Sequence, residues 1–468
     1  ILFLAPTRPL VEQHFNYFKK HLPELFCQMD IFTGKTPAEK RTKLWQNSDV
    51  VFSTPQCIGN DLKNSLYDLK EVSLLIEDEA HRCIKNYSYT FVAEKYKESG
   101  ENKKILGLTA SPGHEKEKIK QITDNLGIDE VEIRTRESVD VKQYVKELEF
   151  ETIKIYFPEE FSKVREWLKK IFDRKVEELK NRKLLFERPT KVSLLELQKK
   201  IMNIISSGNT HFNLLSGASS CAQALKIQHA IELLETQTLS SLQSYMGELF
   251  NKAKRKESKG VVNLVKQKEF NQAYTLLIDL ISKKIEHPKV EKLKEVLNKE
   301  IEKKHKVIIF CQYRDTVTKI CREANSINNV NARVFVGQAK KGEGKNETGL
   351  SQKEQQELIR EFAIGKVNVL VSTSIGEEGL DIPEVNLVIF YEPIPSAIRK
   401  IQRAGRTARL IKGKIIILIT RGTRDEAHYW TAFHKEKKMY EVINNLKEDL
   451  KKSSEEPQKK LFENGKIS

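Results

Sequence analysis

The chain has 468 residues, of which 39 % are hydrophobic and 31 % charged, a composition that builds folded cores and excludes wholesale disorder. Lysine and arginine outnumber aspartate and glutamate by 81 to 65, and this excess of +16 favours a polyanionic partner. The six cysteines show no C-x-x-C or zinc spacing, and no apolar run reaches the roughly 18 residues that a membrane-spanning helix needs.

The first third of the chain alternates short apolar runs with helical patterns. The runs lie at 1–4, 49–53, 72–76 and 105–108. This rhythm predicts a parallel, doubly wound α/β sheet. Because the sequence opens inside an apolar run that begins with Ile1, we expect it to be a fragment whose own start lies upstream.

The middle of the chain, from 158 to 304, is rich in lysine, glutamate and leucine and nearly free of proline, which predicts several long helices. Between 158 and 288 there are 23 basic and 15 acidic residues, so this segment carries +8 of the total +16. The surplus favours contact with nucleic acid, and a solvated helical scaffold is the alternative.

From 305 to 435 the α/β rhythm returns. Strands are predicted at 306–310, 367–371, 385–390 and 414–419. We therefore expect an α/β domain at 1–150, a helical insert at 151–290, a second α/β domain at 291–450 and a polar tail at 451–468.

The segment Asp78-Glu79-Ala80-His81 directly follows the apolar run at 72–76. A carboxylate pair just past a parallel strand lies at the sheet edge where such folds bind ligands. An ATPase needs one carboxylate to hold Mg²⁺ through water and another to orient the attacking water, and these roles suit Asp78 and Glu79 respectively. An exposed strand-to-helix turn is the alternative interpretation.

Small hydroxyl residues follow two of the predicted strands. Thr109 and Ser111 come after the run at 105–108, where they would couple the carboxylates to a second domain or simply cap a helix. In the polar stretch that follows the predicted strand at 367–371, Thr373 is a donor for a nucleic-acid phosphate. Further along this stretch Gly379 permits a tight turn, and Asp381 is an acceptor for a ribose hydroxyl.

The run from 402 to 409 reads Q-R-A-G-R-T-A-R and is the sharpest local signal. Arg406 and Arg409 lie three positions apart, so on a helix they share a face. Arginines that reach in from a second domain stabilise the charge that develops on a γ-phosphate. A basic surface helix is the alternative.

Taken in order, these segments resemble the motifs of superfamily 2 DEAH-box helicases. Ala5–Leu10 resembles motif Ia, and Thr33-Gly34 and Thr54-Pro55-Gln56 resemble the next two strand-contact motifs. The resemblance assigns contacts with the nucleic-acid backbone to Pro6, Thr7, Arg8, Gly34, Thr54 and Thr373. It also adds His81 and Gln402 to the catalytic set.

A finer resemblance, to archaeal Hef and its eukaryotic relatives of the Fanconi anaemia M type, covers nearly the whole chain. It rests on the amino-acid sequences of the segments 78–89, 229–237, 335–338 and 391–399. It implies an α/β fold of two RecA-like parallel-sheet domains with an inserted all-helical domain, and it implies ATP and Mg²⁺ as cofactors.

The same resemblance implies a 3′→5′ DNA helicase or translocase that acts on forked or branched DNA in repair or replication restart. It implies a cytoplasmic, nucleoid-associated protein of an archaeon, with no membrane partner. A related RNA-dependent ATPase and a nucleic-acid-binding module without ATPase activity are the alternatives. Hef continues into a nuclease domain, and whether one follows here stays open.

The phosphate-binding loop G-x-x-x-x-G-K-[ST] should precede motif Ia, yet it occurs nowhere in the 468 residues. Gly34-Lys35-Thr36 resembles its last part, but Met29 stands where the first glycine should be. We therefore expect this chain alone to be deficient in ATP binding, because the loop supplies most of the phosphate donors.

Overall fold

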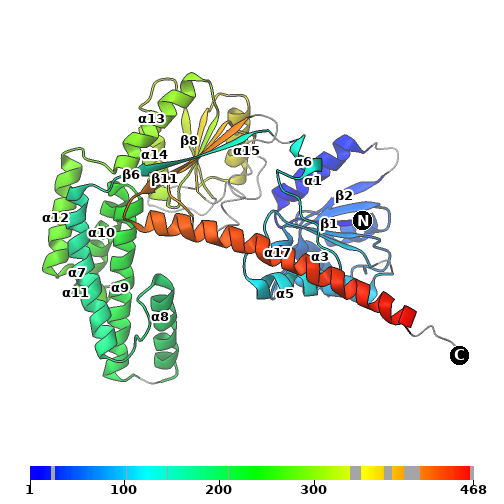
Figure 1. Ribbon diagram of the computed structural model, residues 1–468, viewed down its shortest axis with the longest axis horizontal. Coiled ribbons are helices and arrows are strands. Elements are labelled where there is room, and N and C mark those ends of the chain that lie inside the picture. The colour runs from blue at the N-terminus through cyan, green and yellow to red at the C-terminus, as the bar shows by residue number, and fades with distance from the viewer. Residues whose placement is uncertain are drawn as a thin grey trace.

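The structure is a computed structural model that describes residues 1–22, 27–101, 103–144, 146–208, 210–337, 349–373, 382–394 and 412–463, with side chains to 451. Figure 1 shows two α/β bodies, a helical bundle beside one of them, and a long C-terminal helix that runs from the bundle side to the N-terminal body. No helix in these ranges is both long enough and apolar enough to cross a membrane.

The N-terminal body is a five-stranded, all-parallel sheet in the order β2-β3-β1-β4-β5. The strands are β1 Leu2–Leu4, β2 Met29–Phe32, β3 Val50–Ser53, β4 Leu75–Asp78 and β5 Ile105–Leu108. The helices are α1 Arg8–His21, α2 Ala38–Trp45, α3 Pro55–Lys63, α4 Ser88–Ser99, α5 Lys116–Leu126 and the short α6 Val139–Lys142, with the 3-10 turn η2 at Ala80–Arg82. The predicted doubly wound sheet is confirmed.

Alternation along β1 and β4 divides the core of this body into two layers. Phe3 and Ile76 pack with Val11 of α1 on one face. Leu2 and Leu4 pack with α3, α4 and α5 on the other. β4 begins three residues later than the apolar run predicted, because Val72 closes a turn by donating its backbone N–H to the Leu69 carbonyl.

The helical insert is also confirmed. It contains α7 Glu159–Asn181, α8 Lys191–Ser206, α9 Phe212–Thr236, α10 Leu239–Lys254, α11 Lys259–Val265 and α12 Lys268–Ser282. α9 is central, because α7, α8, α10 and α11 all pack against it. Its apolar side chains fill two separate clusters, one shared with α7, α10, α11 and α12 and one shared with α7 and α8. The segment therefore has two hydrophobic cores of its own.

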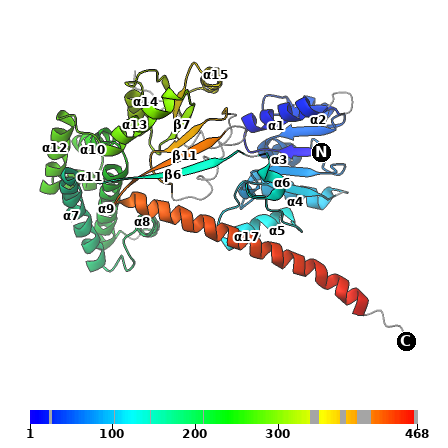
Figure 2. The ribbon, with the colours of Figure 1, turned by 45° about the horizontal axis from the view of Figure 1, so that its top comes forward.

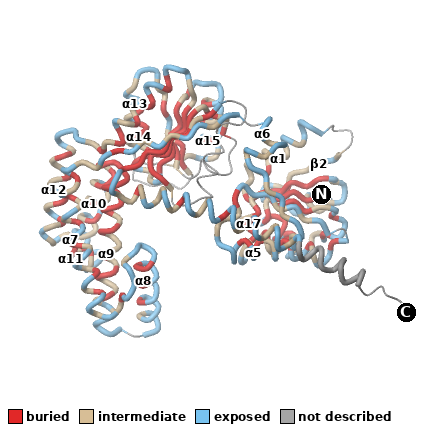
Figure 3. The backbone as a smooth tube through the Cα atoms, in the orientation of Figure 1, coloured by how far each residue is buried: buried red, intermediate tan, exposed pale blue. Residues whose placement is uncertain are grey.

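The second α/β body is a six-stranded, all-parallel sheet in the order β6-β11-β10-β7-β9-β8. The strands are β6 Leu148–Ile155, β7 Val307–Phe310, β8 Ala332–Phe335, β9 Val369–Ser372, β10 Leu387–Phe390 and β11 Gly413–Thr420. The helices are α13 Pro288–Glu302, α14 Arg314–Ala324 and α15 Gln352–Ala363. The buried strands stand out in both sheets in Figure 3.

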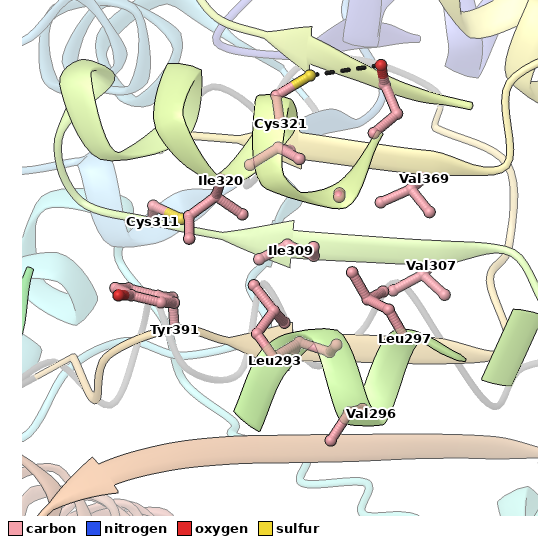
Figure 4. Packing of buried hydrophobic residues seen from close by; sticks show 14 of the residues in the cluster. Leu293, Val296, Leu297, Val307, Ile309, Cys311, Ile320, Cys321, Val369 and Tyr391 are labelled. Atoms are coloured by element: carbon pink, nitrogen blue, oxygen red, sulfur yellow. Dashed lines mark hydrogen bonds between the residues drawn. The ribbon is translucent and has the colours of Figure 1, made fainter. Parts of the chain in front are cut away.

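One face of this sheet packs against α13 and α14, and the other packs against α15. In Figure 4, Val307 and Ile309 of β7 lie between Leu293 and Leu297 of α13 and Ile320 of α14. The alternate residues of β7 point to the opposite layer, where α15 packs. Both faces are covered, as a parallel sheet requires.

β6 belongs to the second sheet, since it pairs with β11 from Leu148 to Ile155. The chain therefore enters the second body before it forms the bundle. The domain boundary expected at 150 falls inside this strand. A local pattern does not reveal the crossing, because the partner strand lies more than 250 residues further along the chain.

A buried polar cluster, here called the joint, connects the bundle, the second sheet and the C-terminal helix. The Lys289 ammonium lies 2.5 Å from the Asp425 carboxylate, and both side chains are 0 % exposed. Lys289 also donates to the Thr236 carbonyl at the end of α9, and its ammonium lies 5.2 Å from the ring centroid of Tyr391. Asp425 accepts the backbone N–H of Thr420, the last residue of β11.

Three further side chains extend the joint. His287 caps α13 by accepting the backbone N–H of Lys289, and burial, followed by the charge of Lys289, lowers the pKa of His287 to about 3. The Tyr313 hydroxyl donates to Glu232 at 3.1 Å. Burial alone would raise the pKa of Glu232, but the nearby His229 ring and the hydrogen bond from Lys191 lower this pKa to about 2.

The C-terminal helix α17, Arg424–Glu463, leaves the joint and crosses to the N-terminal body (Figures 1 and 2). There Met439 and Ile443 form a small core with Ile119 of α5. Lys447 pairs with Glu132 at 3.1 Å. The segment expected as a polar tail after residue 450 continues this helix as far as Glu463.

Candidate nucleotide and nucleic-acid site

The carboxyl end of every strand in the first sheet carries at least one predicted site residue. The strands lie along this edge in the order β2, β3, β1, β4 and β5. The corresponding predicted site residues are, in the same order, Gly34, Thr54, Thr7, Asp78 and Thr109, of which Asp78 is the last residue of its strand and the others follow theirs. Parallel strands end at the same edge of a sheet, so residues distant in sequence become neighbours. The candidates for nucleic-acid contact occupy one half of the edge, and the carboxylates and their partners occupy the other.

Asp78 is the last residue of β4 and is held from three sides. Its Oδ1 accepts the backbone N–H of Glu79 at 2.9 Å, and its Oδ2 lies 2.8 Å from Nε2 of His14 in α1. The buried Tyr89 hydroxyl donates to its main-chain carbonyl at 2.6 Å. The side chain is only 18 % exposed, so the segment from Asp78 to His81, which resembles helicase motif II and is called motif II below, is not the exposed turn of the alternative interpretation.

Glu79 has a left-handed backbone, with φ of 53°. Such a conformation costs a non-glycine residue about 1–3 kcal/mol, and it persists where the surrounding structure enforces it. Here it ends β4 and starts the 3-10 turn η2. The Glu79 carboxylate lies 3.2 Å from Nδ1 of His81, and both side chains are less than one-fifth exposed.

His81 and Thr109 connect motif II to the end of β5. His81 Nδ1 lies 3.1 Å from the Thr109 hydroxyl, which accepts the backbone N–H of Ser111 at 3.2 Å. The Ser111 hydroxyl donates to the sulfur of Met439 in α17 at 2.9 Å. The helix N-cap alternative for Thr109 and Ser111 is wrong, because α5 begins at Lys116.

Thr7 and Thr54 are the N-cap residues of α1 and α3. Neither side chain caps its helix, and each helix has proline in its first turn. The backbone N–H groups of both helix starts therefore point toward the same sheet edge, and such N-termini bind anions. The buried Thr7 hydroxyl has no hydrogen-bond partner within the described ranges.

The other contact candidates differ in how they lie. Gly34 is exposed after β2 and has open space where a Cβ would lie, whereas Pro6 is buried. Arg8 pairs with Glu12 at 2.7 Å on the surface of α1. Thr373 follows β9 of the second sheet and is half-buried, at the corresponding edge of that body.

Part of the predicted site lies outside the described residues. These residues are Gly379, Asp381, Gln402, Arg406 and Arg409.

Sequence reasoning missed two participants. His14 contacts Asp78 from 64 residues away, and Met439 contacts Ser111 from 328 residues away. The only local signal for His14 is its place three residues after Val11, on the side of α1 that faces the sheet. Met439 gave no local signal.

The strand interior beside the site holds an acid. Glu77 is fully buried, and because side chains alternate along β4 it points into the core opposite Asp78. Burial raises the pKa of Glu77 well above its usual range.

The face of β5 beside Asp78 is uncovered within the described ranges. Leu106 pairs with Ile76 and Leu108 pairs with Asp78, so all four side chains point to one side. Yet Leu106 and Leu108 are 44 % and 39 % exposed. Apolar residues of a parallel strand are normally buried on both faces, so this surface is suited to a further packed element.

Family models match three consecutive parts of the chain. Residues 1–119 match "DEAD/DEAH box helicase", residues 160–285 match "Putative ATP-dependent RNA helicase, helical bundle", and residues 288–411 match "Helicase conserved C-terminal domain". Together with the two parallel sheets and the motif II edge, these matches define the class. The chain belongs to the superfamily 2 DEAD/DEAH-box helicases.

Comparison with a solved structure narrows the class. The chain is 42 % identical to the helicase domain of Hef from Pyrococcus furiosus, covering 92 % of this chain and 88 % of that domain with a TM-score of 0.69. It therefore belongs to the Hef family of helicases.

Two curated relatives are similar over almost the whole chain. One is "Putative ATP-dependent RNA helicase MJ1505" of Methanocaldococcus jannaschii, which is 40 % identical over 95 % of this chain and 55 % of its own length. The other is "ATP-dependent DNA helicase mph1" of Sclerotinia sclerotiorum, which is 33 % identical over 95 % of this chain and 37 % of its own length. The chain thus spans about half or less of these relatives.

Proposed function

We propose that this chain is the motor of an ATP-dependent 3′→5′ DNA helicase or translocase that acts on forked or branched DNA in repair or replication restart. The observation that carries the proposal is the first sheet's edge, where Asp78, Glu79 and His81 lie beside the N-termini of α1 and α3. The similarity to the Hef helicase domain and to the Sclerotinia sclerotiorum relative named as a DNA helicase supports DNA as the substrate.

The nucleic-acid strand would bind along the β2, β3 and β1 half of the edge. Helix N-terminal N–H groups and the Thr7 and Thr54 hydroxyls are donors for phosphate oxygens. Gly34 leaves room for close approach of the backbone. Contacts of this kind hold phosphates without reading bases, so binding would be tolerant of sequence and sensitive to salt.

The nucleotide would bind at the β4 and β5 half. Asp78 fits Mg²⁺ held through water, since each carboxylate oxygen has one protein donor and keeps lone pairs for water. The metal would supply positive charge to the phosphates. Glu79 would orient the attacking water, and His81 with Thr109 would relay its position to Ser111 and α17.

We propose that further contacts with the nucleotide come from the second α/β body and from a phosphate-binding loop. Gln402, Arg406 and Arg409 would reach the γ-phosphate, and Gly379 and Asp381 would contact the nucleotide from the second body. The uncovered face of β5 suits a further strand and helix bearing the phosphate-binding loop, packed against Leu106 and Leu108.

The first experiment measures ATP hydrolysis and DNA binding by the 468-residue chain and by the same chain extended upstream. We expect both to bind forked DNA and only the extended protein to hydrolyse ATP. Rapid DNA-stimulated hydrolysis by the 468 residues alone would overturn the proposed position of the phosphate loop. Failure of both proteins to bind DNA or RNA would overturn the motor assignment.

An RNA-dependent motor is the second candidate. Two names favour it. The Methanocaldococcus relative is named as a putative RNA helicase, and the family model that matches the helical bundle is also named for an RNA helicase. Forked DNA and an RNA fork of the same sequence separate the two. We expect forked DNA to stimulate hydrolysis about tenfold more than the RNA fork, equivalent to about 1.4 kcal/mol, and the reverse order would favour RNA.

A further inference from the structure

His14 lies on the helix whose N-terminus is the proposed strand contact. α1 is one unbroken helix that starts at Arg8 with Thr7 as its N-cap. At 1.5 Å per residue, His14 lies about 9 Å along the axis from Arg8. A helix of this length moves as a unit, so a displacement of its first turn also displaces His14.

The His14 ring is held in one orientation by two contacts. Its centroid lies 4.5 Å from that of Phe3, which is buried in β1. Its Nε2 lies 2.8 Å from Oδ2 of Asp78. An ionised carboxylate only accepts hydrogen bonds, so Nε2 carries the hydrogen and donates.

The two oxygens of Asp78 are held by elements of different kinds. Oδ1 accepts from Glu79, which is adjacent in the chain and belongs to the same strand end. Oδ2 accepts from His14, which belongs to α1. The orientation of the carboxylate therefore depends on where α1 lies, and a displacement of about 1 Å in such a group can cost about a hundredfold in rate.

We propose that His14 is a positioning residue that links the docking of a nucleic-acid strand at the start of α1 to the Asp78 carboxylate. This inference rests on the proposed function, since it needs the strand at Thr7 and the metal at Asp78. Binding of the strand fixes α1, and His14 then fixes the carboxylate in the orientation that suits a hydrated divalent cation. By linkage, the cation tightens strand binding by the same factor.

The test measures this linkage directly. The protein extended upstream, loaded with a non-hydrolysable ATP analogue, is titrated with Mn²⁺ by electron paramagnetic resonance with and without single-stranded DNA. We expect DNA to tighten Mn²⁺ binding by about fivefold or more. His14→Leu, which keeps the bulk and removes the donor, should bring this factor close to one. His14→Gln, which keeps a donor, should restore most of it.

Tyr17→Leu is the matched control, because Tyr17 is an exposed ring on the same helix. It should leave the linkage factor and the DNA-stimulated hydrolysis unchanged. In hydrolysis assays, His14→Leu should lower the ratio of stimulated to basal rate by about tenfold. DNA affinity without the cation should stay within about twofold of the parent.

The outcomes separate the inference from the function on which it rests. A His14→Leu protein that folds, binds DNA and keeps the full linkage factor would overturn the positioning role and leave the motor intact. A His14→Gln protein as defective as His14→Leu would also overturn it, because the donor would then be irrelevant. A parent protein that binds neither DNA nor nucleotide would overturn both.

Discussion

The motif II edge and the joint are both polar clusters at the meeting of several elements, yet they are built in opposite ways. At the edge, the side chains of His14, Asp78, Glu79 and His81 are 13–27 % exposed. At the joint, Lys289 and Asp425 are fully buried and ion-paired. Partly exposed groups can exchange partners with water or a ligand at low cost, whereas a buried pair cannot separate without stranding a charge. The first region suits a reaction cycle, and the second suits permanent attachment.

The largest expected effect is on ATP hydrolysis and comes from a substitution at the motif II edge that leaves the fold intact. Glu79→Gln removes the carboxylate that would orient the attacking water. In the protein extended upstream, this substitution should therefore lower the rate of ATP hydrolysis about 10²–10⁴-fold. DNA affinity should be unchanged, since Glu79 lies on the nucleotide half of the edge. The exposed Glu71→Gln is the control. A loss below tenfold would rule out this role for Glu79.

The second prediction concerns a substitution that removes the buried ion pair of the joint. Asp425→Asn leaves the Lys289 ammonium buried without its counter-ion and should cost about 3 kcal/mol or more in the free energy of unfolding, measured by urea titration. Replacing both partners, as Lys289→Met with Asp425→Leu, should recover much of this loss. Lys283→Met, which breaks the exposed pair with Asp279, should cost less than about 1 kcal/mol. Equal costs for the two single changes would contradict the comparison.

The third prediction concerns the helix that connects the two regions. Met439 is 1 % exposed and packs against Ile119 and the Ser111 hydroxyl. Met439→Ala should cost about 2 kcal/mol and speed backbone hydrogen exchange in α17. Tyr440→Ala, at a half-exposed neighbour, is the control. Unchanged exchange in Met439→Ala would mean that α17 does not depend on this contact.

The smallest expected effect is a pH dependence specific to the joint. The folded-state pKa of His287, about 3, lies below the unfolded value, so the unfolded chain binds more protons between these values. Stability should therefore rise with pH across this window and be lost as the pH falls, by about 1.4 kcal/mol per unit. His287→Asn keeps a capping acceptor and cannot titrate.

The measurement is the urea midpoint between pH 5 and 6.5, a range above the usual pKa of carboxylates. The parent should lose stability toward pH 5 more steeply than His287→Asn. Parallel slopes would show that His287 is not the group responsible.

Much of the architecture could be predicted from local patterns. The apolar runs at 1–4 and 105–108 became β1 and β5, and the proline-poor middle became the bundle. Asp78 came at a strand end, as its place after an apolar run predicted, although β4 begins later than that run. These features depend on the periodicity and turn chemistry of neighbouring residues, which a sequence displays directly.

The sequence by itself determined the order of the motifs, the class of fold and the candidate chemistry at Asp78 and Glu79. The tertiary structure decided which distant residues serve them: His14 on Asp78, Met439 on Ser111, and β6 in the second sheet. The physical reason is the distance along the sequence between the residues that make contact. A strand or helix follows from contacts a few residues apart, whereas these contacts join segments separated by 64 to 328 residues and form only when whole sheets and helices have packed.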